Sequence, residues 1–185
     1  MGRPKLLLPW GATSVLGHLR RQWQALGPEQ FAVVCAADDS AVKRELDRLG
    51  VPDLERIDNP APERGMFSSI QCAASWAGWN STLTHWGIAL GDQPHLRLQT
   101  LRGLIDFASA HSRDICQPGY QGRPRHPVIV PRREFAELAR SDAPDLKSFL
   151  ASRPSAVYEV DDPGLDLDLD QPEDYERALR LADCG

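Results

Sequence analysis

Long hydrophobic runs are missing from this sequence of 185 residues. No stretch approaches the roughly 20 consecutive apolar residues that a membrane-spanning helix needs. Near the N-terminus the basic residues Arg3 and Lys5 precede three leucines and then Pro9, and this apolar run is too short for a secretory signal peptide. We therefore expect a cytoplasmic protein that has no membrane segment.

Cysteine is scarce, and its spacing carries no motif. The four cysteines are Cys35, Cys72, Cys116 and Cys184, and no pair has the Cys-x-x-Cys spacing. This scatter argues against a zinc site and against a disulfide framework. We expect reduced thiols in a cytoplasmic protein.

An excess of positive charge is also missing. The chain has 21 lysines and arginines against 26 acidic residues, a formal net charge of -5. Without a basic stripe, nucleic acid is not expected as a main partner. A small anionic ligand remains compatible, because a few local cations are enough to bind it. The length and ordinary composition favour a single domain over residues 1–185.

Two common catalytic patterns are absent as well. The sequence has no Ser-His-Asp or Cys-His order and no Gly-rich Walker loop.

The first half of the sequence alternates between strand and helix patterns. Helices are predicted over 13–26, 39–49, 66–79 and 98–111, buried strands over 31–36 and 88–90, and a short strand within 51–57. This alternation predicts an α/β fold with a mostly parallel sheet and helices on both faces.

The second half is less regular. Strands are predicted over 114–117, 126–130 and 156–160, helices over 133–140 and 146–151, and a loop over 118–125. Residues 165–170 alternate between leucine and aspartate, which predicts a strand with one apolar and one acidic face. The last helix is predicted to begin within 171–174.

One stretch, residues 86–94, combines a buried strand with an acidic end. Ile88, Ala89 and Leu90 form a continuous apolar run, and Asp92 follows Gly91 directly. Ligands bind at the carboxyl ends of parallel strands, and a carboxylate there suits Mg²⁺, which keeps several waters and takes one or two protein carboxylates. The alternative is that Asp92 caps the following helix or makes a turn.

The aspartates at positions 166, 168 and 170 would share one face of the predicted strand. Three carboxylates in a row repel one another unless they are solvated or neutralised by a cation. A solvated row at a sheet edge is one interpretation. In the other, one of Asp166, Asp168 and Asp170 joins Asp92 in binding a metal together with substrate phosphates.

A few other polar residues are candidates for ligand contacts. Lys5 could bind a phosphate as a point charge, or be an ordinary surface cation. The helix predicted to begin at 66–69 after Gly65 could offer N–H groups and hydroxyls to a ligand, or be a plain cap. His126, before a proline, is more typical of a hydrogen-bonded structural residue than of a catalyst.

Five stretches, taken in order, resemble motifs of the molybdenum cofactor nucleotidyltransferases, and within them the cytidylyltransferase branch. They are residues 1–9, 59–70, 91–94, 122–127 and 168–174. Each stretch alone is a weak signal, but five in the right order over nearly the whole chain are a strong one. The resemblance implies a Rossmann-like fold of three layers, αβα.

The resemblance also implies a reaction. A CMP or GMP unit would move from a nucleoside triphosphate to the phosphate of the molybdenum cofactor, with release of pyrophosphate and with CTP favoured over GTP. Asp92 and Asp168 would bind Mg²⁺, and Lys5 with Arg3 would bind the triphosphate. Lys5 and Asp92 would thereby be the catalytic residues.

By the same resemblance, Ser69 and its helix start would face the base or ribose of the nucleotide. His126 and the loop over 120–125 would shape the pterin side. The expected partners are small-molecule substrates and a client molybdenum hydroxylase.

The sequence departs from the family pattern in three places. The family signature begins with a strand and a Leu-Ala-Ala-Gly phosphate loop before the Met-Gly that starts this sequence, so we expect the first strand and that loop to be missing. The cause would be a start codon assigned too late or a truncated form. Arg125 stands where the family has glycine, and 141–145 replace a Gly-Asp-x-Gly.

These departures keep two alternative functions open. One is nucleotidyl transfer to another phosphorylated small molecule. The other is a non-catalytic truncated homologue that binds the cofactor or a client molybdoenzyme.

Overall fold

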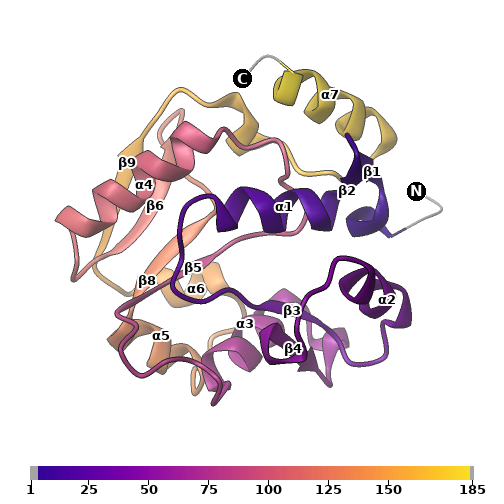
Figure 1. The fold of residues 1–185 in the computed structure, drawn as a ribbon. Coiled ribbons are helices and arrows are strands. Elements are labelled where there is room, and N and C mark those ends of the chain that lie inside the picture. Colours follow the sequence, from indigo (N-terminus) through magenta and orange to yellow (C-terminus); the bar gives the residue numbers. More distant parts are fainter. Residues whose placement is uncertain (1–3, 184–185) are drawn as a thin grey trace.

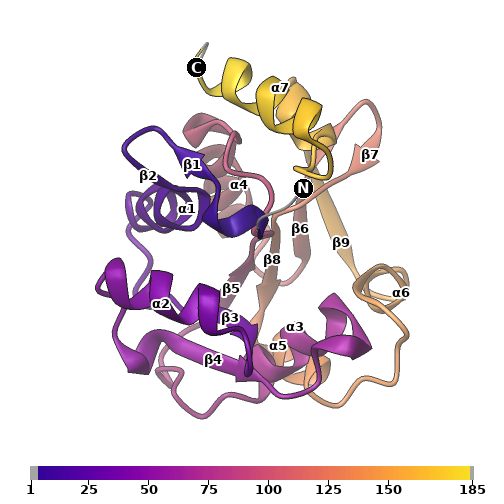
Figure 2. The ribbon, with the colours of Figure 1, turned by 90° about the vertical axis from the view of Figure 1, so that its right-hand side faces the viewer.

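The computed structural model describes residues 4–183 and has three layers. A central sheet lies between helices α1 and α4 on one face and helices α3, α5 and α6 on the other (Figures 1 and 2). The expected α/β, Rossmann-like class is confirmed. In the described residues, none of the helices combines the length and apolar character needed to cross a membrane.

The α-helices lie close to the predicted positions. They are α1 (Val15–Gln24), α2 (Ser40–Arg48), α3 (Met66–Ser75), α4 (Leu98–Ala110), α5 (Arg132–Leu138), α6 (Leu146–Leu150) and α7 (Pro172–Asp183). Side-chain caps set two of the starts, because Ser14 Oγ accepts from Gly17 N at 3.1 Å and Asp39 accepts from the first N–H groups of α2. Short 3₁₀ turns η1 (Lys5–Leu7), η2 (Asp53–Glu55), η3 (Pro62–Arg64) and η4 (Pro163–Asp166) complete the helical elements.

The strands are short, and several of them alternate with helices along the chain. They are β1 (Pro9–Trp10), β2 (Thr13–Ser14), β3 (Val33–Ala36), β4 (Arg56–Asn59), β5 (His85–Ile88), β6 (Ile115–Tyr120), β7 (Arg123–Pro124), β8 (Val128–Pro131) and β9 (Ser155–Glu159). The strand expected within 51–57 begins only at Arg56, because η2 occupies the preceding residues.

The expectation of a mostly parallel sheet is wrong. In the five-stranded sheet β5–β8, β8–β6 and β6–β7 are antiparallel and only β6–β9 is parallel, while β3 and β4 form a separate parallel pair. The connection from β6 through β7 to β8 contains no helix and is too short for a parallel crossover, so the chain must return antiparallel.

The sheet is also divided in two. Within the described residues β3 pairs only with β4, and β5 pairs only with β8. Helix α1 joins the two parts of the sheet, because its Leu16 packs with Cys35 of β3 and its Trp23 lies next to Gly87 of β5. On the other face, helix α3 contacts β3.

Three local predictions are corrected. Helix α3 ends at Ser75 rather than at residue 79, because Trp79 Nε1 donates to Ala73 O at 2.7 Å and folds the chain back. Residues 118–125 form a β6–β7 hairpin instead of a loop, with positive φ at Gln121 and Gly122. Residues 165–170 are no strand, because η4 takes up their start, although the leucines are still buried and the aspartates exposed.

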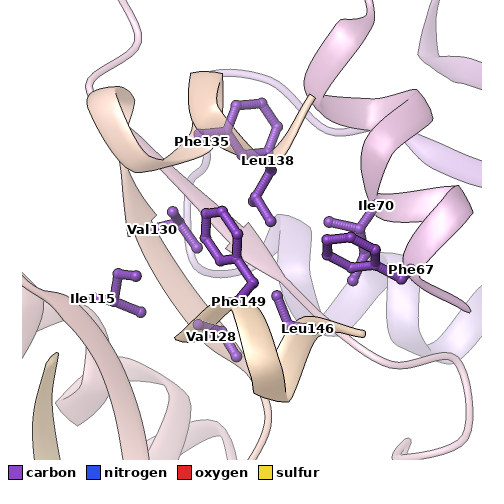
Figure 3. Close-up of a cluster of buried hydrophobic side chains, with 9 residues drawn as sticks. All are labelled: Phe67, Ile70, Ile115, Val128, Val130, Phe135, Leu138, Leu146 and Phe149. Atoms are coloured by element: carbon purple, nitrogen blue, oxygen red, sulfur yellow. The ribbon is translucent and has the colours of Figure 1, made fainter. Parts of the chain in front are cut away.

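The two sheet faces bury different clusters. Figure 3 shows the larger one, in which side chains of α3, α5 and α6 pack on Ile115, Val128 and Val130. On the opposite face α4 covers Cys116 and Ile129. This alternation along β6 and β8 is the period of two that a strand covered on both faces requires.

The cysteines in the described residues are free thiols. Cys35 and Cys116 are buried and Cys72 is half-buried. Cys184 and Arg3 lie outside the described residues.

Candidate active site

The candidate site lies where the chain leaves β5. Strand β5 ends at Ile88, and Asp92 follows in a turn. Gly91 allows the N-terminal segment to approach this turn, since a Cβ there would lie 2.7 Å from Leu6 Cδ2. As a result Lys5, the first residue of η1, is brought next to Asp92.

Asp92 is held in an unfavourable electrostatic setting for a carboxylate. Burial raises the pKa of its carboxyl group, the charge of Asp168 raises that pKa further, and Lys5 opposes both. Its Oδ1 atom is buried without a hydrogen-bond partner among the described residues. A buried, unpartnered carboxylate oxygen beside a second carboxylate is suited to accept a cation.

Lys5 provides the positive charge of the site. Its Nζ lies 2.5 Å from Asp170 Oδ1 and 4.0 Å from Asp92 Oδ2. The hydrogen bond to Asp170, followed by the charges of Asp170, Asp92 and Asp168, raises the pKa of Lys5. The ammonium therefore stays charged at neutral pH and is about one-third exposed to an incoming anion.

Each aspartate of the 166–170 row has a different partner. Asp166 forms an ion pair with Arg125. Asp168 Oδ1 accepts from Gln93 Nε2 at 2.9 Å, and Asp170 pairs with Lys5. The structure thus brings Asp168 beside Asp92, whereas the carboxylates on either side of it are engaged by cations.

Backbone and buried polar contacts fix the row against β5. Leu169 N donates to the carbonyl of Asp92 at 3.2 Å. Upstream, the buried Asp162 accepts from Thr100 Oγ1 at 2.6 Å, and His95 Nε2 lies 2.9 Å from the carbonyl of Gly164. These contacts hold the 165–170 segment in place without strand pairing.

Sequence reasoning missed Gln93, His95 and Asp162. Gln93 is 5% exposed and its Oε1 has no partner in the described chain, so it reaches the site with one hydrogen-bonding atom unused. Its place directly after Asp92 was the available signal. His95 and Asp162 show no local pattern, because their role depends on contacts more than 60 residues apart.

The sequence also predicts Ser69 and His126 as site residues. Ser69 Oγ, in the first turn of α3, accepts from Asn59 Nδ2 at 2.9 Å. His126 precedes β8 next to the end of β5; burial lowers the pKa of its imidazole, and its Nδ1 is buried without a partner in the described residues. The hydrogen bond of Ser69 and the burial of His126 are therefore compatible with a structural role as well as with a role in ligand binding.

The residues present fit a divalent cation of the magnesium type. In residues 4–183 no group of three acidic, histidine or cysteine side chains gathers as a complete ligand set. Two carboxylates, Asp92 and Asp168, with an unsatisfied oxygen on the first are the donors that Mg²⁺ accepts when water and phosphate oxygens complete its coordination.

The three-layer fold, with a lysine and carboxylates at the end of a strand, is that of the α/β nucleotidyltransferases. The model of the MobA-like NTP transferase domain matches residues 1–157. The chain belongs to this family. The comparison with curated proteins finds no significant match.

Solved structures agree with this assignment. The crystal structure of Rv0371c from Mycobacterium tuberculosis H37Rv is 29% identical, with a TM-score of 0.76 over 97% of this chain and 90% of that one. The structure of Rv0371c in complex with manganese is also 29% identical, with a TM-score of 0.73 over 97% and 93%. Molybdopterin-guanine dinucleotide biosynthesis protein A from Archaeoglobus fulgidus is 16% identical, with a TM-score of 0.70 over 100% and 93%, and shows the shared fold.

Proposed function

We propose that this protein transfers a CMP or GMP unit from a nucleoside triphosphate to the phosphate of the molybdenum cofactor and releases pyrophosphate. The observation that carries the proposal is the meeting of Lys5, Asp92 and Asp168 at the end of β5. Membership in the family supports nucleotidyl transfer, and the name of the Archaeoglobus relative supports this acceptor.

The proposed chemistry needs no general base. An oxygen of the acceptor phosphate, already an anion, bonds to the α-phosphorus of the nucleotide, and the bond from that phosphorus to the bridging oxygen of the β-phosphate breaks. Pyrophosphate leaves with that oxygen. The residues then have to position two anions and neutralise their charge.

Each residue has a distinct task in this proposal. Lys5 binds the triphosphate as a point charge. Asp92 and Asp168 hold a divalent cation, which when bound offsets the negative charge of the phosphates. Gln93 orients Asp168 through the hydrogen bond between their side chains. Ser69 contacts the base or ribose, and His126 lies on the acceptor side.

The test is pyrophosphate release by the full chain with CTP or GTP, Mg²⁺ or Mn²⁺, and molybdenum cofactor as acceptor. We expect release with CTP to exceed release with GTP, and to be lost in Asp92→Asn. No release with either nucleotide from a folded protein would contradict the proposal.

A second candidate is transfer to a different phosphorylated small molecule. The observation that favours it is Arg125, whose pairing with Asp166 brings a guanidinium to the acceptor side where the family has glycine. Pyrophosphate release with other phosphate monoesters, but not with molybdenum cofactor, would select this candidate. In either case the partners are small molecules; delivery to a client molybdenum hydroxylase would be tested by co-purification.

A further inference from the structure

A second cavity lies beside α3, and none of the residues given a task in the proposed chemistry lines it. Its volume is about 430 Å³, within the range of small-molecule pockets. Its walls come from the end of β4, from η3 and α3, and from the connection between α5 and α6. That connection contains residues 141–145, where the sequence departs from its family.

The floor of this cavity is rigid. Asn59 is 1% exposed and Ser68 is 5% exposed. Asn59 Nδ2 donates to Ser68 Oγ at 2.8 Å, and Ser68 Oγ lies 2.7 Å from the carbonyl of Gly65, which it can reach as donor. Since all these groups are satisfied within the protein, they fix the shape of the floor and leave ligand binding to the walls.

The walls are tied together. Gln71 Nε2 on α3 donates to the carbonyl of Ser141 at 2.9 Å and so joins α3 to the connection between α5 and α6. Beneath it, Phe67 of α3 packs with Leu138 of α5 and Phe149 of α6 in the cluster of Figure 3. A cavity bounded by elements that share a core keeps its shape when it is empty.

The charge of the walls favours an anion. Arg64 of η3 and Arg140 after α5 both line the cavity, and among the described residues Asp142 is the one carboxylate that lines it. Within residues 4–183 neither guanidinium has an ion pair with an acidic group, unlike Arg125 and Arg153. Two guanidiniums from separate segments are the groups that bind phosphate through charge-assisted hydrogen bonds.

We propose that this cavity is a phosphate-binding site distinct from the site around Lys5 and Asp92. Its ligand carries a phosphate dianion, either as free inorganic phosphate or as the phosphate monoester of a small molecule. Asn59 joins the cavity to Ser69, the residue proposed above to contact the base or ribose, because its Nδ2 also donates to Ser69 Oγ at 2.9 Å. The proposal does not depend on the nucleotidyl transfer proposed above.

The test uses Cys72, which lines the cavity and is half-buried, as a reporter. The full chain is titrated by calorimetry with inorganic phosphate, phenyl phosphate and acetate, and alkylation of Cys72 is followed by peptide mass spectrometry. We expect phosphate binding that slows the alkylation of Cys72, and acetate binding at least tenfold weaker. Tighter binding of phenyl phosphate than of inorganic phosphate assigns the site to a monoester, and the reverse assigns it to free phosphate.

Variants separate this site from the one around Lys5. Arg64→Gln and Arg140→Gln should each weaken phosphate binding roughly tenfold or more, the loss of a hydrogen bond to a charged group. Arg102→Gln is the matched control, because Arg102 is an exposed arginine of α4 in the other helical layer. Lys5→Gln should leave the protection of Cys72 unchanged. Phosphate binding that disappears in Lys5→Gln but survives in both arginine variants, or no binding at all, would overturn the proposal.

Discussion

Lys5 Nζ lies 2.5 Å from Asp170 Oδ1 across 165 residues of sequence, while Asp92 Oδ2 lies 4.0 Å from the same ammonium. Asp170 is about two-thirds exposed, so this ion pair stabilises the fold little. In the proposed function, however, a nucleotide phosphate must compete with Asp170 for Lys5.

This competition predicts the effect of Asp170→Asn. Nucleotide binding without metal should tighten by up to about fivefold, which corresponds to the free energy of an exposed ion pair. The free energy of unfolding should change by less than about 1 kcal/mol. Calorimetric titration with CTP and a urea unfolding curve measure the two effects. Lys5→Gln is the control, in which nucleotide binding should weaken because the ammonium itself is lost. Weaker nucleotide binding in Asp170→Asn would contradict the predicted competition.

Asp92→Asn should remove activity and yet stabilise the protein. Its carboxylate is charged in the folded state at a cost, because burial and Asp168 raise its pKa. For a carboxyl with a raised pKa in the fold, stability is lost as the pH rises through that pKa. The amide variant should therefore unfold at higher urea than wild type at pH 7.5, with the difference vanishing below the usual aspartate pKa of about 3.9.

The loss of turnover in Asp92→Asn should be at least about 100-fold, the usual cost of removing one electrostatic stabiliser of a transition state. Pyrophosphate release measures it. Full activity in this variant would remove Asp92 from the proposed mechanism, whatever the stability shows.

The ion pair of Arg125 with Asp166 should affect the acceptor and not the nucleotide. It joins the end of the β6–β7 hairpin to the aspartate row on the acceptor side of the proposed site. We expect Asp166→Asn to raise KM for the acceptor by up to about fivefold and to leave KM for CTP unchanged. Steady-state kinetics with each substrate varied in turn would show an equal rise in both KM values if this assignment is wrong.

Acid should destabilise the protein through one buried and two half-buried histidines. Burial lowers the pKa of His18, His95 and His126. Because the unfolded chain binds protons on these imidazoles from about pH 6.5 downward and the folded chain binds fewer, stability falls as the pH drops through that range. Urea midpoints between pH 8 and pH 5.5 measure the slope. His95→Gln should make it shallower, and an unchanged slope would exclude His95 as a contributor.

The hydrophobic cluster of Figure 3 should contribute strongly to the free energy of unfolding. Phe149 is 1% exposed, its ring lies 6.4 Å from that of Phe67, and Arg153 lies over its face at 3.5 Å. Phe149→Ala should lower the free energy of unfolding by about 3–5 kcal/mol. Leu54→Ala is the control, because Leu54 is 70% exposed and its loss should stay within about 0.5 kcal/mol.

Local patterns in the sequence determined most of the elements. The caps at Ser14 and Asp39 and the alternation of residues 165–170 depend on neighbours a few positions apart, and burial follows that alternation even though 165–170 form no strand. The same patterns placed Asp92 after a strand. They did not predict strand direction, because direction is set by how the chain returns through β7.

Only the tertiary structure decided which charges meet. The sequence offers Asp166, Asp168 and Asp170 as equivalent carboxylates, and packing gives them to Arg125, Gln93 and Lys5 respectively. Ion pairs and desolvation depend on distances of a few ångströms between groups far apart along the chain, which no local period records. For that reason the sequence alone determined the kinds of residue at the site, while their arrangement came from the fold.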